Sequence, residues 1–179
     1  MGLATTVSSQ GLSDADRQAI AHYSAEFIEA ARYGELDDLQ LMFGHKQLCE
    51  LIDFPNLVDP ESQTSPLMYA AANGCFDCVQ FLINTVEVSV DRPNNSGNTP
   101  LHWAALNGHV EVVDFLISHG ANVFTKNNFG QTSFDEAFVR DKKDCCERIA
   151  REECRILKER GDEDDEPMLV STAIDRIDE

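Results

Sequence analysis

Several hallmarks of membrane, secreted and nucleotide-binding proteins are missing from this chain of 179 residues. Its apolar segments, such as residues 79–83, fall far short of the roughly 20 residues that a membrane-spanning helix needs. The first residues lack the basic stretch and apolar run of a secretory signal, and no glycine-rich phosphate loop is present. We therefore expect a soluble protein of a reducing compartment, the cytosol or the nucleus, in which the six cysteines are thiols.

Basic residues are also scarce, because 14 lysines and arginines stand against 32 acidic residues, for a net charge of −18. Such a field repels phosphate backbones and anionic membranes, so we expect no direct contact with nucleic acid or membranes. The same field attracts basic proteins and speeds their association. We predict a basic protein partner, while the alternative is that the acidity serves solubility alone.

Against this background the sequence repeats itself. Residues 65–74, SPLMYAAANG, align with residues 99–108, TPLHWAALNG, at a spacing of 34, and residues 130–134 continue the series at a spacing of 33. Upstream, residues 27–36 place two alanines and Gly34 on the same pattern. The last unit carries Asp141 where the others have glycine, and extra residues stand within 44–63. About four helix-turn-helix units can bury a continuous core by stacking.

Local chemistry explains the pattern of each unit. Thr99 can cap a helix whose first turn holds Pro100, while a slim pair of alanines lets neighbouring helices approach closely. Gly108 permits the left-handed turn that ends this helix. His102 is expected to join adjacent turns by hydrogen bonds. In the second helix, the predicted core stripe consists of Val110, Val113, Leu116 and Ile117.

Helices are expected to cap both ends of the array. Ser13 starts an N-terminal helix with Ile20, Tyr23, Phe27 and Ile28 as apolar positions, and residues 144–159 form a final helix that Gly161 stops. We predict a flexible leader at 1–12, a repeat domain at 13–160 and an acidic, disordered tail at 161–179. The leader begins Met1-Gly2 with Thr6, which fits a loose myristoylation pattern as well as an unstructured segment.

Candidate catalytic and metal-binding residues find a simpler explanation in the repeats. Cys75-x-x-Cys78 and the pair at 145–146 could together supply the four thiolate ligands of a zinc site. However, Cys78 and the later pair fall on slots that Val112 and Val113 fill in the central repeat, which predicts small buried apolar groups. The five histidines do not cluster. We expect no enzymatic activity, no metal and no cofactor.

A binding surface can be predicted instead. In a stacked array, the tips of the turns between repeats, called fingers, and the exposed face of each first helix line one concave side. Trp103 occupies the free slot after T-P-L-H, and Tyr69, Glu29 and Glu136 are its equivalents. The two residues before each turn glycine are also left free by the signature, and they are Arg32, Tyr33, Ala72, Asn73, Leu106 and Asn107. The tips of the turns between repeats complete the candidate protein-binding residues, and they are Asn94, Asn95, Asn127, Asn128 and Phe129. Aromatic anchors ringed by polar groups are typical of binding hot spots, although packing along the helices is the alternative for Trp103 and Tyr69.

These motifs resemble the ankyrin-repeat family over residues 25–159. The segment from Ala30 to Leu39, the Gly97–Ala104 motif, residues 127–130 and the acidic tail look like small fungal ankyrin-repeat chaperones of the Yar type. The resemblance implies an all-α ankyrin solenoid that shields one newly made, basic KH-domain protein of the small ribosomal subunit until assembly. It also implies a 1:1 complex with the client's N-terminal segment in the groove, in the cytoplasm and the nucleus.

Two functions follow from this reading. The first is the dedicated chaperone, in which the tail acids hold lysines or arginines of the client; these acids are Asp162, Glu163, Asp164, Asp165 and Glu166. The alternative is a regulatory ankyrin adaptor that docks on an enzyme or transcription factor and inhibits or localises it. If the protein is such an adaptor, its affinity for the target is expected to depend little on the acidic tail.

Overall fold

The computed structural model describes residues 13–160, and within that range it is built of helices and loops, as expected. The elements are α1 (Asp14–Tyr33), α2 (Leu36–Phe43), α3 (Lys46–Leu51), the 3₁₀ turn η1 (Phe54–Asn56), α4 (Pro66–Asn73), α5 (Phe76–Asn84), α6 (Pro100–Asn107), α7 (Val110–Ser118), α8 (Ser133–Val139) and α9 (Lys143–Arg160). The predicted leader, acidic tail and helix stop at Gly161 lie outside the described residues.

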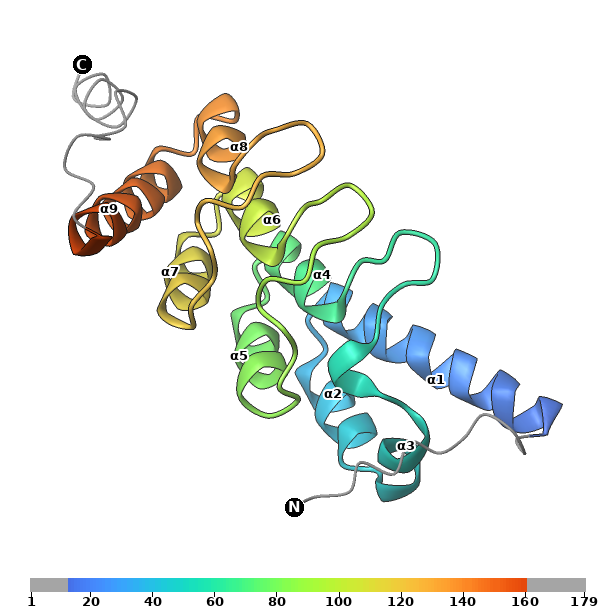
Figure 1. Ribbon diagram of the computed structural model, residues 1–179. Coiled ribbons are helices and arrows are strands. Elements are labelled where there is room, and N and C mark those ends of the chain that lie inside the picture. The colour runs from blue at the N-terminus through green and yellow to red at the C-terminus, as the bar shows by residue number, and fades with distance from the viewer. Residues whose placement is uncertain (1–12, 161–179) are drawn as a thin grey trace.

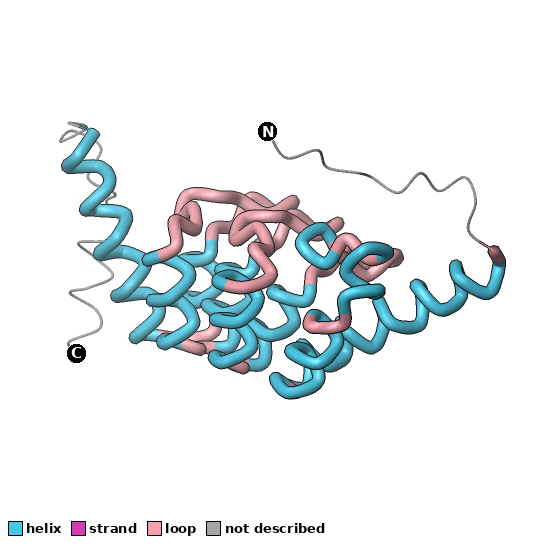
Figure 2. The backbone as a smooth tube through the Cα atoms, turned by 90° about the horizontal axis from the view of Figure 1, so that it is seen from below, coloured by secondary structure: helices cyan, strands magenta, loops and turns pink. Residues whose placement is uncertain are grey.

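Four pairs of helices stack side by side (Figure 1). The inner helices α1, α4, α6 and α8 pack against one another in that order, and α2, α5, α7 and α9 form the outer layer. The loops before α4, α6 and α8 project along one edge as fingers, while α1 and α9 extend at the two ends (Figure 2). The predictions of about four repeats and of helices at both ends are confirmed.

The inner helices begin and end for the reasons that the sequence indicated. The Ser65 hydroxyl accepts the backbone N–H of Met68 at 3.3 Å, which satisfies a donor that the first turn leaves free. Three inner helices then end at a glycine in the left-handed region, namely Gly34, Gly74 and Gly108 with φ of 76°, 69° and 82°. Close packing adds a second requirement, because a side chain of the following repeat covers each glycine. The covering residues are Cys75 over Gly34, His109 over Gly74 and Lys142 over Gly108.

Three described residues other than glycine take the left-handed conformation, namely Gln63, Glu87 and Asp141, and the last two stand where another repeat has a glycine. Asp141, which the alignment places in the slot of Gly108, has φ 54°. Glu87 has φ 61° in the slot that Gly120 fills, with φ 85°, in the next repeat. A side chain in this region crowds the following carbonyl, so both residues hold backbone strain.

The predicted core stripe of α7 is confirmed at its centre, and its two end residues pack against the core without being fully buried. Val113 and Leu116 are fully buried, whereas Val110 and Ile117 are only partly buried. They stand in the first and last turns of α7, where the neighbouring helices cover less of the surface, and Val110 borders a cavity. Val112 is buried as well, at 1% exposure, as expected for the slot that it shares with Cys78.

His102 joins two repeats as predicted. Its Nδ1 accepts the backbone N–H of Thr99 at 3.2 Å, and its Nε2 lies 3.1 Å from the carbonyl oxygen of Gln131 in the next finger. Because Nδ1 accepts, the proton must be on Nε2, which donates to that carbonyl. Burial lowers the pKa of His102, so the imidazole stays neutral.

The extra residues between the first and second repeats form α3 and η1. Phe54 of η1 is buried at 1% exposure, and its ring centroid lies 4.6 Å from that of Phe27 and 5.7 Å from that of Phe43. Phe43 in turn meets Phe81 of the second repeat edge-on at 5.9 Å. This segment therefore supplies aromatic packing at the first junction.

Candidate protein-binding surface

The inner helices and finger tips place most of the predicted binding residues on one side of the array, here called the inner-helix surface. Its centre is formed by Tyr69 on α4 and Trp103 on α6, two helices that pack together. Both side chains are partly buried. They are thus rigid enough to act as anchors and still offer surface to a partner.

Tyr69 lies beneath a cation. The guanidinium carbon of Arg32 is 4.2 Å from the centroid of the tyrosine ring, a cation–π distance. Arg32 also donates from Nη1 to Glu29 Oε1 at 2.6 Å. The three predicted residues form one cluster that joins the first two repeats. Tyr33, next to it, is 68% exposed.

Trp103 carries an unusual polar group. Its indole Nε1 is buried and has no hydrogen-bond partner among the described residues. A buried donor without an acceptor costs about 1–3 kcal/mol, so such a group calls for an explanation. Within residues 13–160 this N–H is thus a polar group of the inner-helix surface that lacks an acceptor.

The predicted asparagines before the glycines have a structural task. Asn73 donates its amide to the carbonyl of Arg32, and Asn107 donates to the carbonyl of Ala72, both at 2.8 Å. Each side chain thereby ties its inner helix to the end of the preceding one. Leu106, beside Asn107, is partly buried and lines a cavity of about 350 Å³.

The finger asparagines likewise build the fingers. Asn94 Oδ1 accepts the backbone N–H of Ser96 at 2.9 Å, and Asn127 plays the same part in the next finger. Other bonds join one finger to the next: the Asn95 amide donates to the Glu61 carbonyl and the Asn128 amide to the Asn95 carbonyl, at 2.8 and 2.9 Å. The repeated Asn-Asn-x-Gly sequence signals such asparagine-capped turns. Phe129, at 77% exposure, is left at the tip as an apolar group free for a partner.

The predicted acidic ends of the surface already have polar partners, a cation for Glu29 and an uncharged amide for Glu136. Glu29 pairs with Arg32, and Glu136 accepts the Asn127 amide at 3.1 Å. A denser group of acids stands at the turn after Gly34, where Glu35, Asp37 and Asp38 line a cavity of about 390 Å³. The sequence analysis did not include this acidic group, and the signal that could have found it is the run of acids at residues 35–38. The tail acids, Asp162 to Glu166, lie outside the described residues.

Three predicted buried cysteines are in the core. Cys78, Cys145 and Cys146 are at most 3% exposed, and burial raises the pKa of each thiol to about 11. Thiols of this kind are poor nucleophiles and poor metal ligands. Among residues 13–160, no group of three histidine, cysteine or acidic side chains is arranged to hold a metal ion. None of the helices in that range is long and apolar enough to cross a membrane.

Comparison with known proteins agrees with this geometry. A family model for ankyrin repeats, in three copies, matches residues 27–127. The solved structures similar to this chain include a chain of the complex between the yeast ribosomal protein Rps3 and its chaperone Yar1. The two chains are 32% identical, with a TM-score of 0.62, over 75% of this chain and 91% of the other. No curated protein matches the sequence.

Proposed function

Because this chain belongs to the ankyrin-repeat family, whose repeats generally bind other proteins, we propose that it is a dedicated chaperone of a newly made, basic ribosomal protein. The observation that carries the proposal is the 32% identity to a chain of the Rps3–Yar1 complex, over 91% of that chain. The proposed client is a KH-domain protein of the small subunit. The role is one of binding and shielding, without catalysis.

Charge supports this choice of client. The net charge of −18 attracts a basic chain and opposes RNA, so the client's RNA-binding surface is a suitable target. Exposed acids such as Asp37, Asp38 and Asp77 spread this field over the outer layer. Steering of this kind raises the association rate and weakens as salt screens it, over a Debye length of about 8 Å at physiological ionic strength.

The inner-helix surface provides the anchors. In this proposal the client's N-terminal segment lies across Tyr69 and Trp103, in a 1:1 complex, and the tail acids hold client lysines or arginines. Complex formation begins in the cytoplasm, where the client is made, and continues into the nucleus, where assembly of the small subunit starts.

An affinity purification at low and at high salt, with mass spectrometry of the retained proteins, tests the proposal. A chaperone of this kind retains one basic ribosomal protein in stoichiometric amount at low salt and much less of it at high salt. Retention of an enzyme or transcription factor at both salt concentrations, with no ribosomal protein, contradicts the proposal and supports the adaptor function.

A matched pair of variants tests the surface itself. Tyr69→Ala combined with Trp103→Ala should weaken binding of the purified client by at least about tenfold, since a hot-spot residue contributes 2 kcal/mol or more. Tyr23→Ala, on the protruding part of α1, is the control and should leave affinity unchanged. Calorimetry measures both affinities, and circular dichroism checks the fold. Equal affinities for the double variant and the wild type would exclude this surface.

A further inference from the structure

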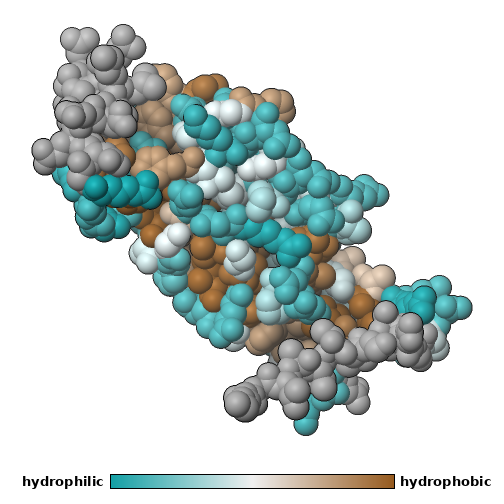
Figure 3. Space-filling view, in the orientation of Figure 1, coloured by the Kyte–Doolittle hydropathy of each residue, from teal (hydrophilic) through white to brown (hydrophobic). Residues whose placement is uncertain are grey.

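An apolar area is exposed at the α8 end of the array (Figure 3). Phe138 is 53% exposed, stacked on Phe134 at 6.2 Å, and Val139 is 68% exposed. The repeat alignment places Phe138 in the slot of Ala105, which α8 buries completely. No further repeat follows α8 within residues 13–160, so the slot that joins one repeat to the next is open here.

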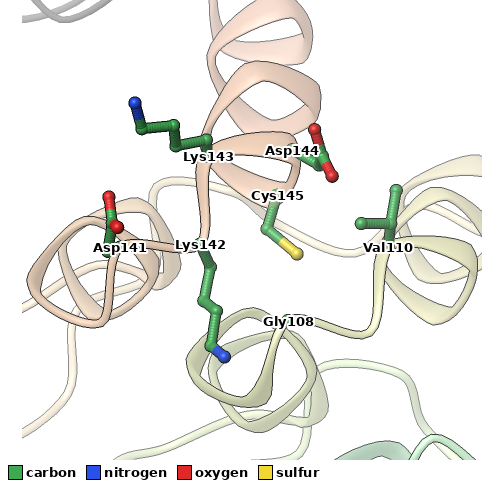
Figure 4. Close-up of a pocket in the computed structure, with 7 residues that line it drawn as sticks. All are labelled: Gly108, Val110, Asp141, Lys142, Lys143, Asp144 and Cys145. Atoms are coloured by element: carbon green, nitrogen blue, oxygen red, sulfur yellow. The ribbon is translucent and has the colours of Figure 1, made fainter. Parts of the chain in front are cut away.

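A group of cations borders this apolar area. Arg140, Lys142 and Lys143 follow it directly, and none of them belongs to an ion pair formed by the described residues. Lys142 reaches over Gly108 while Lys143 points away from it, and Asp141 and Asp144 lie on opposite sides of the two lysines (Figure 4). A cavity of about 330 Å³ opens at this turn. We call the three cations the basic corner.

The basic corner is unexpected in so acidic a chain. The equivalent turn of the first repeat carries acids, Glu35, Asp37 and Asp38, at the corresponding edge of the array. Three cations without ion pairs, next to exposed apolar groups, therefore fit an occupant that is apolar in one part and acidic in the next. The proposed client is basic and does not match this description.

The chain itself contains such a segment. Residues 168–179, MLVSTAIDRIDE, start with apolar residues and end with acids. The apolar residues are Met168, Leu169, Val170, Ala173, Ile174 and Ile177, and the acids are Asp175, Asp178 and Glu179. Apolar side chains at positions 170, 174 and 177 would share one face of a helix.

The length of the intervening chain selects this segment over the acids nearer to α9. From Lys143 to Arg160, α9 spans about 26 Å. The acids at 162–166 are at most six residues beyond Arg160 and reach only about 20 Å, which is too short to return to the basic corner. Residue 175 is fifteen residues beyond and reaches about 50 Å when extended. The nearer acids thus stay free for a client even when the segment returns.

We propose that residues 168–179 bind back onto the end of the last repeat, with their apolar residues over Phe138 and Val139 and their acids against the basic corner. The bound segment replaces the missing neighbour of α8 and covers the exposed apolar area. This contact does not depend on the identity of the client.

A photo-crosslinker placed at position 138 of the full chain tests the contact. Phe138 suits this purpose because the interior repeats carry alanine in its slot, so the fold does not require the native ring. We expect crosslinked peptides that contain residues 168–179, within monomers on a denaturing gel. Crosslinks confined to dimers would assign the area to a second copy, and no crosslinks to the tail would overturn the proposal.

Hydrogen exchange of full-length variants gives an independent test. Val170→Asp with Ile174→Asp should speed amide exchange in residues 138–143 by at least threefold, because the apolar contact is lost. Ser171→Asp with Thr172→Asp changes the charge by the same amount at two polar positions outside the apolar face, and it should leave amide exchange near the wild-type rate. Equal exchange in the wild type and both variants would refute the contact, as would equal acceleration by the two pairs.

Discussion

The close covering of Gly74 by His109 makes the replacement of this glycine by alanine a sharp test of how the repeats are joined. A Cβ atom at Gly74 would lie 2.5 Å from Nδ1 of His109 and 2.9 Å from Cγ, so the whole ring must move. The same ring lies 3.0 Å, through Nε2, from the carbonyl of Ala72, the hydrogen bond that holds it in place. Gly120 is the matched control, because it also has positive φ, 85°, but a Cβ there meets nothing within 4 Å.

The expected magnitudes separate backbone strain from packing. Alanine in the left-handed region costs about 1–2 kcal/mol, offset by up to about 1 kcal/mol from the stiffer unfolded chain. Gly120→Ala should therefore destabilise by about 1 kcal/mol. Gly74→Ala adds the displaced hydrogen bond, about 1 kcal/mol, and overpacking of about 1–3 kcal/mol. We expect it to destabilise by about 3–5 kcal/mol.

Urea unfolding followed by far-ultraviolet circular dichroism and by the fluorescence of the single tryptophan, Trp103, measures these differences. Coincident transitions and equal m-values are required, since arrays of repeats can unfold in parts. A double-mutant cycle with His109→Ala isolates the contact: once the ring is gone, Gly74→Ala should cost little more than Gly120→Ala. If Gly74→Ala and Gly120→Ala destabilised equally, or if His109→Ala gave no relief, the reasoning would be refuted.

Three further predictions concern single side chains. Glu153 is buried beside Asp135, and its burial first, then the nearby acid, raises its pKa to about 7; because the folded pKa exceeds the unfolded one, stability falls as pH rises from about 4.5 to 7. Glu153→Gln should remove that fall and stabilise the protein by up to about 3 kcal/mol at pH 8. Urea unfolding at several pH values measures the effect, and the same stability profile for both proteins would contradict the prediction. Glu87→Gly should stabilise by about 0.5–1 kcal/mol by relieving positive φ, and a loss of stability in urea would contradict the strain. His102→Ala removes the hydrogen bonds of Nδ1 to Thr99 and of Nε2 to the Gln131 carbonyl, and it should lower the free energy of unfolding by about 2–3 kcal/mol. A change below about 0.5 kcal/mol would show that His102 does not hold Gln131 in place.

The repeat pattern was sufficient to predict the architecture, because each signature residue solves a local problem. Thr99, Pro100 and Gly108 set where a helix starts and stops whatever lies around it, and the spacing of 33–34 residues then fixes the number of units. Burial at the end of a helix depends on the neighbour instead. For that reason Val110 packs against the core but is only partly buried, and the packing of Phe54 in the inserted segment was not foreseen.

The binding residues were harder to predict. A position that the repeat signature does not specify can still hold a side chain that is hydrogen-bonded to a neighbouring repeat. Asn73 and Asn107 were proposed as groove residues, yet their amides hold neighbouring helices together. Sequence alignment shows which slot a residue occupies, but the donors and acceptors around it come from another repeat. Tyr69 and Trp103 stay predictions as anchors, to which the structure adds the stacked Arg32 and the unpaired indole N–H.

The three residues that cover the turn glycines differ in stiffness, with a thiol at the first junction, a hydrogen-bonded imidazole at the second and a flexible lysine stem at the third. The units are therefore not interchangeable modules, although their backbones follow the same course. Exchange or duplication of one unit by recombination would bring together a glycine and a covering side chain that were not matched to each other. The effect of a substitution at one of these glycines therefore depends on the side chain that covers it from the next repeat, so the two positions are energetically coupled.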